Sequence, residues 1–268
     1  MPQAHVNGIS VNYQIDNASS AKDTVVLING LADDLDFWAP QIPALVATGY
    51  RVLRFDNRGI GKTDKPAGPY TSRLLADDAK ALVDSLGLRD FHLLGVSMGG
   101  MIAEEYALAY ESDLKSLTLA CTYGKADPFC QTMFAMWADL ARGLGVPFVM
   151  RDVGLWAFTG PFFEDRPDDA AELATAMAAV DMPLDAYLAQ LAVIQRHDAL
   201  DRVAGLTVPT LVMAGEEDIL IPVRLSQRLH AAIPGSHWAT VTGGHACVQE
   251  HPDPFNAAFL DFIGGVAR

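Results

Sequence analysis

Short runs of apolar and β-branched residues alternate along the chain with longer stretches in which apolar side chains recur every three or four positions. The short runs are typical of buried strands, and the longer stretches are typical of helices that pack on a sheet. Buried strands are predicted at residues 24–28, 50–55, 91–96, 114–121 and 208–214, with a last strand at 238–242. This alternation predicts an α/β fold in which helices cover both faces of a mostly parallel sheet.

Helix signals lie between these strands, and a hairpin signal precedes them. Residues 6–15 alternate apolar and polar side chains around Asn7-Gly8, which predicts an antiparallel ribbon. Asp36 is expected to cap a helix that covers residues 37–45. Further helices are predicted at residues 74–86, 98–109 and 254–263.

The stretch 125–199 breaks this alternation, because it is helical in composition and contains no convincing strand. It holds nine of the 23 aromatic residues and five of the nine methionines, so it is rich in side chains that cover apolar cavities. We expect it to form a helical cap inserted into a core made of residues 1–124 and 200–268. The substrate pocket is expected to include Trp137, Trp156, Phe158 and Cys247.

Acidic residues outnumber basic ones, with 33 Asp and Glu against 19 Lys and Arg and a net charge of −14. Such a charge repels phosphates and anionic lipid, so neither a nucleic acid nor a membrane is expected as a partner. The sequence contains no apolar run of the roughly 18 residues that a membrane span needs, and no signal-peptide pattern, which favours a cytoplasmic protein. Three cysteines without CxxC spacing exclude a disulfide scaffold and a zinc knuckle.

The strongest local motif is Gly95-Val96-Ser97-Met98-Gly99, which follows a predicted strand and precedes a predicted helix. This is the G-x-S-x-G pattern in its strand-turn-helix context, where the serine sits on a strained turn at the carboxyl edge of the sheet. Ser97 is therefore the candidate nucleophile.

A serine nucleophile needs a base, and the base needs an acid that orients it. In this fold class the chain order is serine, acid, histidine. Of seven histidines, only His245 follows the last predicted strand in a glycine-rich turn, so it is the candidate base. Asp218 follows the strand at 208–214 and is the candidate acid, with Glu217 as the alternative.

The oxygen of a tetrahedral intermediate needs two amide donors. The usual pair is the residue after the nucleophile and a residue in the loop after an earlier strand, which here are Met98 and Leu31. Asp33 and Asp34 follow in that loop, and their charges would oppose an oxyanion. We therefore expect both side chains to face solvent or to cap the next helix.

Two further residue types carry alternative interpretations. The cap arginines could clamp a substrate carboxylate or pair with the cap's own acidic residues on the surface, and they are Arg142, Arg151, Arg166 and Arg196. Cys247 lies two residues past His245, but without an elbow motif we interpret it as a packed small side chain rather than a thiol nucleophile.

Together these residues resemble the α/β-hydrolase superfamily over essentially the whole chain. The segment 54–66 is similar to the D-x-R-G-x-G-x-S-D-x-P loop of its small cap-bearing members, with Thr63 in place of the commoner serine. The resemblance implies an eight-stranded, mainly parallel sheet, a cap at 125–199, and no metal or organic cofactor. Asn29-Gly30 departs from the family's His-Gly, which implies a different hydrogen-bonding pattern in the oxyanion loop.

Within this superfamily, the segment 68–71 together with the motif around Ser97 resembles enol-lactone hydrolases and related esterases. The absence of a tryptophan directly after His245 makes the chain less like the carbon-carbon bond hydrolases of aromatic ring cleavage. A serine at position 97 also excludes the carboxylate-based mechanism of haloalkane dehalogenases and epoxide hydrolases.

The sequence therefore predicts a serine hydrolase that cleaves an ester or lactone of a small, largely apolar molecule through an acyl-serine. One alternative is a carbon-carbon bond hydrolase that acts on a vinylogous diketone with the same three residues. Another is a ligand sensor that retains the triad but performs no reaction. The sequence does not determine the oligomeric state, and a homo-oligomer is one option that it leaves open.

Overall fold

The computed structural model describes residues 2–266, and within this range eight strands form a single sheet in the order β1-β2-β4-β3-β5-β6-β7-β8. β1 and β2 form an antiparallel hairpin, β2 pairs antiparallel with β4, and the other neighbours are parallel. The strands are β1 (Gln3–Val6), β2 (Ile9–Asp16), β3 (Thr24–Ile28), β4 (Arg51–Phe55), β5 (Phe91–Val96), β6 (Leu114–Ala120), β7 (Thr210–Gly215) and β8 (His237–Val241). The predicted fold class is therefore confirmed.

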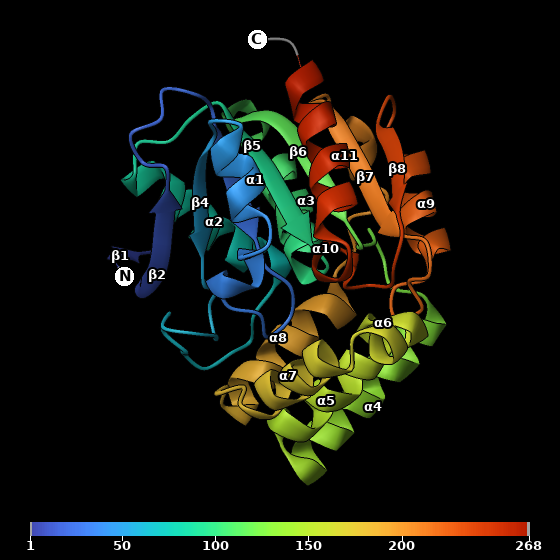
Figure 1. Ribbon diagram of the computed structural model, residues 1–268. Coiled ribbons are helices and arrows are strands. Elements are labelled where there is room, and N and C mark those ends of the chain that lie inside the picture. Colours follow the sequence, from blue (N-terminus) through green and yellow to red (C-terminus); the bar gives the residue numbers. More distant parts are fainter. Residues whose placement is uncertain (1, 267–268) are drawn as a thin grey trace.

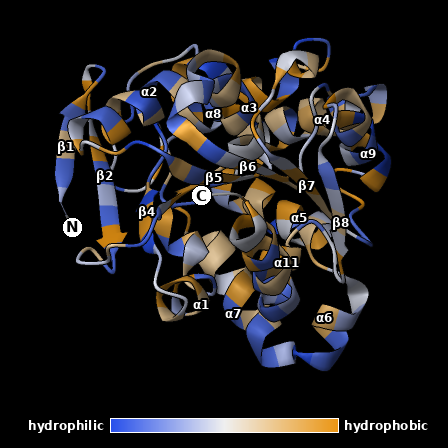
Figure 2. Ribbon diagram, turned by 90° about the horizontal axis from the view of Figure 1, so that it is seen from above, coloured by the Kyte–Doolittle hydropathy of each residue, from blue (hydrophilic) through white to orange (hydrophobic). Residues whose placement is uncertain are grey.

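Helices cover both faces of the sheet, as Figure 2 shows in a view from above. α2, α3 and α9 lie on one face, and α1 and α11 lie on the other. These core helices are α1 (Ile42–Ala47), α2 (Ser72–Ser85), α3 (Met98–Tyr110), α9 (Val223–Ala232), α10 (Cys247–Glu250) and α11 (Pro252–Gly265). The central strands β3, β5 and β7 are buried along their whole length because both of their faces are covered.

Five more helices lie between β6 and β7, beyond the carboxyl ends of the parallel strands (Figure 1). They are α4 (Pro128–Leu144), α5 (Val146–Ala157), α6 (Gly160–Asp165), α7 (Pro167–Ala178) and α8 (Leu184–Arg196). The two ends of this segment meet at an isolated bridge between Lys125 and Asp198, whose side chains also form an ion pair of 2.6 Å. The segment therefore leaves and re-enters the core at one place.

The first helix after β3 differs from the prediction. Instead of one helix capped by Asp36, the chain forms a short 3₁₀ helix, Leu35–Trp38, and then α1. Asp34 is the residue that caps the 3₁₀ helix, by accepting a hydrogen bond from the Asp36 amide. The interruption coincides with Pro40, which has no amide hydrogen and so cannot continue the backbone hydrogen bonds of a helix.

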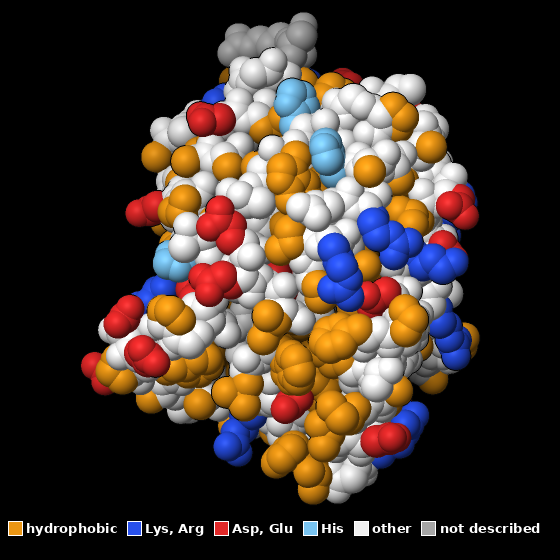
Figure 3. All heavy atoms as spheres, turned by 90° about the vertical axis from the view of Figure 1, so that its right-hand side faces the viewer, with side chains coloured by type: hydrophobic (Ala, Val, Ile, Leu, Met, Phe, Trp, Pro, Cys, Tyr) orange, Lys and Arg blue, Asp and Glu red, His pale blue; other side chains and the backbone are white. Residues whose placement is uncertain are grey.

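The helices between β6 and β7 expose apolar side chains on their outer surface. Figure 3 shows these side chains gathered over this part of the molecule. The large exposed ones in this segment are Phe129, Met136, Leu144, Phe148, Leu155 and Leu184. Exposed apolar patches of this kind are typical of surfaces that contact other molecules. Among residues 2–266, none of the helices has the length and apolar character needed to cross a membrane.

The tightest backbone packing in the core lies where α3 meets the sheet. A Cβ atom added at Gly99 in α3 would lie 2.0 Å from the carbonyl oxygen of Ile28 in β3. A Cβ atom at Gly95 in β5 would lie 2.1 Å from the carbonyl oxygen of Gly99. In both cases the obstacle is backbone rather than a movable side chain, so only glycine allows this approach.

Gly99→Ala should therefore destabilise the protein by about 1 to 3 kcal/mol or more, because α3 would have to move away from β3. Gly154→Ala is the matched control, since Gly154 lies in α5 with nothing within 4 Å of an added Cβ atom. There the higher helix propensity of alanine should raise stability by up to about 1 kcal/mol. Denaturant unfolding of both variants checks this, and equal effects at the two positions would contradict it.

Candidate active site

Ser97 lies on the turn between β5 and α3, with backbone angles of φ +57° and ψ −121°. Residues other than glycine rarely adopt a positive φ, so the surrounding packing must hold this strained turn. The Ser97 amide donates to the carbonyl of Ala120, and the Thr122 hydroxyl donates to the carbonyl of Ser97. These bonds and the glycine packing beneath α3 present the Ser97 side chain at the carboxyl edge of the sheet.

The structure brings Ser97, His245 and Asp218 together in one chain of hydrogen bonds. His245 Nε2 lies 3.0 Å from Ser97 Oγ, and His245 Nδ1 lies 2.8 Å from Asp218 Oδ2. The other carboxylate oxygen of Asp218 accepts a 2.8 Å bond from the Ile221 amide. This geometry allows the imidazole to donate from Nδ1 to Asp218 and to accept the hydroxyl proton of Ser97 at Nε2.

Asp218 and its neighbour Glu217 lie in the turn after β7 and differ in burial. The Asp218 side chain is fully buried against His245, whereas Glu217 is exposed and its amide bonds to the Gly243 carbonyl. The turn that carries His245 is held from the opposite side, because the Ala246 amide donates to the carbonyl of Ala157 at the end of α5. The segment between β6 and β7 therefore supports the loop that carries the histidine.

The electrostatic surroundings of His245 favour its protonated form. Burial alone would lower the pKa of His245, but the charge and hydrogen bond of Asp218 outweigh it, with smaller contributions from Cys121 and Asp33. The net effect raises the pKa of His245 to about 9. The Asp218 carboxylate thus makes the His245 imidazole a stronger base.

The two residues predicted as oxyanion donors, Met98 and Leu31, belong to the elements that border Ser97. Met98 is the first residue of α3, and Leu31 lies in the loop after β3 and lines the cavity beside Ser97. Asn29 replaces the histidine of the family pattern and fixes this loop from within. It is fully buried, and its side chain bonds to the carbonyls of Asp33 and Phe55 and accepts from the Trp38 indole.

Gln190 is a site residue that sequence reasoning missed. It lies in α8 with no exposed surface, and its Oε1 atom accepts a 3.0 Å bond from the amide of Ala32, next to Leu31. Its Nε2 atom donates to the carbonyl of Arg58 in the loop after β4. Ala32 has a φ of +60°, so this bond holds the oxyanion loop in an unusual conformation. A glutamine within a helical pattern carries no sequence signal for such a role.

The expectation that Asp33 faces solvent or caps a helix is wrong. Asp34 is the capping residue, whereas the side chain of Asp33 lies in the wall of the cavity beside Ser97 and His245. Burial and the charge of Asp34 raise the pKa of Asp33 to about 7, although His245 and the Gly30 backbone partly offset them. The Asn29 side chain donates a 3.0 Å hydrogen bond to the Asp33 carbonyl and so fixes the backbone at this position.

A cavity of about 330 Å³ opens beside Ser97 and extends beneath the helices between β6 and β7. Trp137 and Phe158 line it, as predicted, together with apolar side chains of α4, α5, α7 and α8. Trp156 does not line it, because its ring packs against Phe129 instead. Among the described residues, the cavity is lined by no lysine or arginine, so the four cap arginines lie outside it. Its size suits a small organic molecule.

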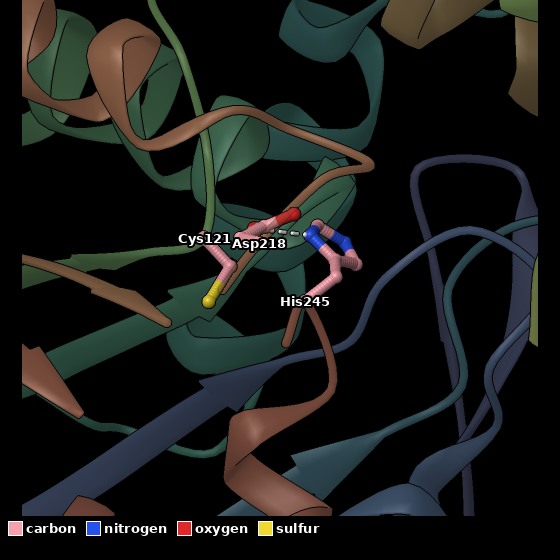
Figure 4. A group of neighbouring side chains, drawn as sticks. All are labelled: Cys121, Asp218 and His245. Carbon is pink, nitrogen blue, oxygen red and sulfur yellow. Dashed lines mark hydrogen bonds and ion pairs between the residues drawn. The ribbon is translucent and has the colours of Figure 1, made fainter. Parts of the chain in front are cut away.

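The prediction that Cys247 belongs to the substrate pocket is wrong, because its side chain packs in the core and does not line the cavity. Its sulfur is buried 3.6 Å from the sulfur of Cys121. The bond to Cys247 and burial hold the pKa of the Cys121 thiol well above its usual value. Both cysteines are buried and serve as small packed side chains. Cys121, Asp218 and His245 could offer metal ligands within 4.8 Å of one another. However, Asp218 and His245 already bond to each other, and the Cys121 sulfur points away from the imidazole (Figure 4).

Residues 23–252 match the protein family described as alpha/beta hydrolase fold. A relative from Azorhizobium caulinodans, provisionally named carbamate hydrolase RutD, is 30% identical over 267 residues, which cover 99% of both chains. A relative with the same provisional name from Agrobacterium fabrum is 28% identical over 262 residues, which cover 94% of this chain and 98% of that one.

Solved structures show the same likeness in three dimensions. The enol-lactonase from Burkholderia xenovorans LB400 superposes with a TM-score of 0.91 at 29% identity, covering 98% of this chain and 100% of that one. A hydrolase from Pseudomonas aeruginosa PA01 superposes with a TM-score of 0.89 at 28% identity, covering 98% of each chain. Because nearly the whole chain is covered, the likeness includes the helices between β6 and β7 as well as the sheet.

The raised pKa of Asp33 predicts a specific pH dependence of stability. Between its ordinary value of 3.8 and about 7, the folded protein keeps the proton of Asp33 while the unfolded chain releases it. The contribution of this group to stability therefore falls as pH rises through this window and is constant above it. Asp33→Asn removes the titration, so its gain in Tm over the wild type should be larger at about pH 8 than at about pH 5.

Asp139→Asn is the control for this measurement, because it removes the same formal charge from an exposed side chain in α4. Its Tm should differ from the wild-type value by the same small amount at both pH values. A gain for Asp33→Asn that does not grow with pH would show that this carboxyl is not destabilised in the folded protein.

Proposed function

This chain belongs to the α/β-hydrolase fold family, and we propose on that basis that it is a serine hydrolase that cleaves an ester or lactone of a small, largely apolar molecule. The observation that carries the proposal is the hydrogen-bonded sequence of Ser97, His245 and Asp218 at the wall of a mostly apolar cavity. Residues 125–199 serve as the cap that closes this cavity above the sheet.

In the first half of the reaction, His245 takes the proton of the Ser97 hydroxyl as the oxygen attacks the substrate carbonyl. Asp218 holds the imidazole in the tautomer that presents an unprotonated Nε2 atom and stabilises the imidazolium that forms. The carbonyl oxygen becomes an oxyanion, and the amides of Leu31 and Met98 donate to it. His245 then gives the proton to the leaving alcohol oxygen, and an acyl-serine remains.

In the second half, water replaces the alcohol and His245 acts as base once more. The proton taken from water returns to Ser97 as the acid product leaves. The mostly apolar lining of the cavity strengthens the charge interactions at each step, because it lowers the local dielectric constant. Fixed positions of the three side chains and two amides mean that no large rearrangement is needed during turnover.

Two features favour small acyl compounds as substrates. The cavity of about 330 Å³ is lined mainly by apolar and aromatic side chains. One structural neighbour is named an enol-lactonase, and relatives carry the provisional name carbamate hydrolase. Lactones, esters and carbamates all present a carbonyl carbon with an oxygen or nitrogen leaving group, so one mechanism with an acyl-serine serves each.

Ser97→Ala tests the proposal directly. Without the nucleophile, kcat on activated short-chain esters should fall by about 10⁶-fold. A fluorophosphonate should add its mass to the wild-type protein and not to this variant. Ser85→Ala is the control, because the Ser85 hydroxyl bonds only to the Leu82 carbonyl within α2. Wild-type turnover in Ser97→Ala would show that Ser97 is not the nucleophile. A wild-type protein that is inactive and is not labelled would favour a ligand sensor.

A panel of substrates separates the reaction classes. Esters, lactones, thioesters, carbamates and a ring-cleavage diketone should be compared by product analysis in the wild type and in Ser97→Ala. We expect the ester or lactone to be cleaved with the highest kcat/KM. Preferential cleavage of the diketone would establish the carbon-carbon hydrolase instead.

The pKa of His245 predicts the pH profile of this reaction. Since the base must be neutral to accept a proton, kcat/KM should rise with pH, with an apparent pKa above the ordinary 6.5 of histidine. Asp218→Asn removes the charge that raises this pKa, so the rising limb should move to lower pH. The maximum kcat should also fall by about 10⁴-fold.

Glu217→Gln is the matched control for that profile, because it removes the same charge from the adjacent, exposed side chain. Its rising limb should stay within about 0.3 pH units of the wild type, as expected for a screened surface charge. An equal displacement in both variants would mean that Asp218 acts only through the general charge of the turn.

A further inference from the structure

The cavity is lined by three acidic residues that the proposed reaction does not use, Asp34, Asp36 and Asp33, and Asp33 is the one beside the nucleophile. Its position follows from Gly30, which has no side chain. An ideal Cβ atom at Gly30 would lie 2.7 Å from Asp33 Oδ2 on one side and 3.5 Å from Ser97 Cβ on the other. The Asp33 carboxyl and the Ser97 side chain therefore both border the space above Gly30.

The neighbouring carboxylates have protein partners, and Asp33 has no basic one. Asp34 accepts the amide of Asp36, and Asp36 forms an ion pair of 3.1 Å with Arg54. No ion pair of Asp33 with a lysine or arginine occurs within residues 2–266, and no such side chain lines the cavity there. Its known contact is with the Gly30 backbone. A carboxylate with so little compensation is costly in a partly desolvated wall.

His245 can carry a positive charge, and its charge acts to lower the pKa of Asp33. That imidazole cannot act as a lasting counter-ion, because it must be neutral when it accepts the proton of Ser97. While His245 is neutral and ready to accept the proton of Ser97, the carboxylate of Asp33 therefore has no positive partner among the described residues.

The rest of the cavity provides a suitable surface for an organic cation. Four aromatic side chains line the same space, and they are Phe37, Phe134, Trp137 and Phe158. Aromatic faces attract alkylated ammonium groups through their quadrupoles, and a carboxylate supplies the opposite charge. Carboxylate-bearing substrates meet repulsion here, because the cavity offers acidic groups and no basic side chain among the described residues.

We propose that the substrate is a largely apolar ester or lactone that carries one alkylated ammonium group, with Asp33 as its counter-ion beside the reacting carbonyl. This inference rests on the proposed function, since it names the substrate class of the same site. It makes Asp33 the residue that determines charge specificity and leaves the chemistry to Ser97, His245 and Asp218.

Matched esters that differ only in charge test this proposal. On the alcohol side, the butanoate esters of 2-(trimethylammonio)ethanol, 3,3-dimethylbutanol and 3-hydroxypropanoate provide a cation, a neutral isostere and an anion. On the acyl side, ethyl 4-(trimethylammonio)butanoate is compared with ethyl 5,5-dimethylhexanoate. The kcat/KM of each ester is measured at about pH 8, where the carboxyl of Asp33 is ionised in the larger fraction of molecules.

In the wild type, the cation should be favoured over its neutral isostere by about tenfold in at least one pair, and the anion should be the poorest substrate. Asp33→Asn keeps the shape of the side chain and should bring the ratio of cation to neutral ester close to one. Asp139→Asn, which removes the same charge from the exposed face of α4, should keep the wild-type ratio. Unfolding curves of both variants show whether each is folded.

The outcomes distinguish this inference from the proposed function. If the neutral esters are hydrolysed but the ratio is near one in the wild type, or is unchanged in Asp33→Asn, the role of Asp33 is refuted while the serine hydrolase remains. A ratio that falls equally in Asp139→Asn also refutes it, because net charge alone would then explain the preference. If no ester is hydrolysed, the proposed function fails and the inference fails with it.

Discussion

The contact on which the site depends is the backbone packing of α3 against β3 and β5. Gly95 and Gly99 allow this contact, since a Cβ atom at either would lie about 2 Å from a carbonyl oxygen. With the helix this close to the sheet, the turn between β5 and α3 has no room for relaxed backbone, and Ser97 takes a positive φ. The strained turn projects the Ser97 side chain into the cavity and leaves the next amide, that of Met98, at the start of the helix.

The segment between β6 and β7 does more than cover the cavity. Gln190 in α8 bonds to the oxyanion loop at Ala32, and the carbonyl of Ala157 in α5 bonds to the amide of Ala246 beside the histidine. The helices between β6 and β7 therefore hold both the loop after β3 and the loop that carries His245. In the proposed reaction, this support gives loops at a sheet edge the fixed geometry that acyl transfer needs.

Two carboxyl groups, those of Asp218 and Asp33, shape the electrostatics of the site. Asp218 is fully buried, bonds to His245 and raises the pKa of the imidazole. Asp33 lies in the cavity wall, has no basic partner among the described residues, and has a pKa raised to about 7 by burial and by the charge of Asp34. Asp218 is thus hydrogen-bonded to a group that can carry a positive charge, whereas Asp33 is not. A group that the protein leaves unmatched within a binding cavity is the natural contact for a substrate.

The sequence by itself determined the α/β fold, the strands and most core helices, because periodic burial and glycine positions are local patterns. It also singled out Ser97, Asp218 and His245, since the motif and the chain order limit the choice. Only the tertiary structure decided which cap aromatics reach the cavity, that Gln190 supports the oxyanion loop, and that Asp33 turns inward. Those outcomes depend on contacts between segments up to 158 residues apart, as for Ala32 and Gln190, and no local pattern encodes such contacts.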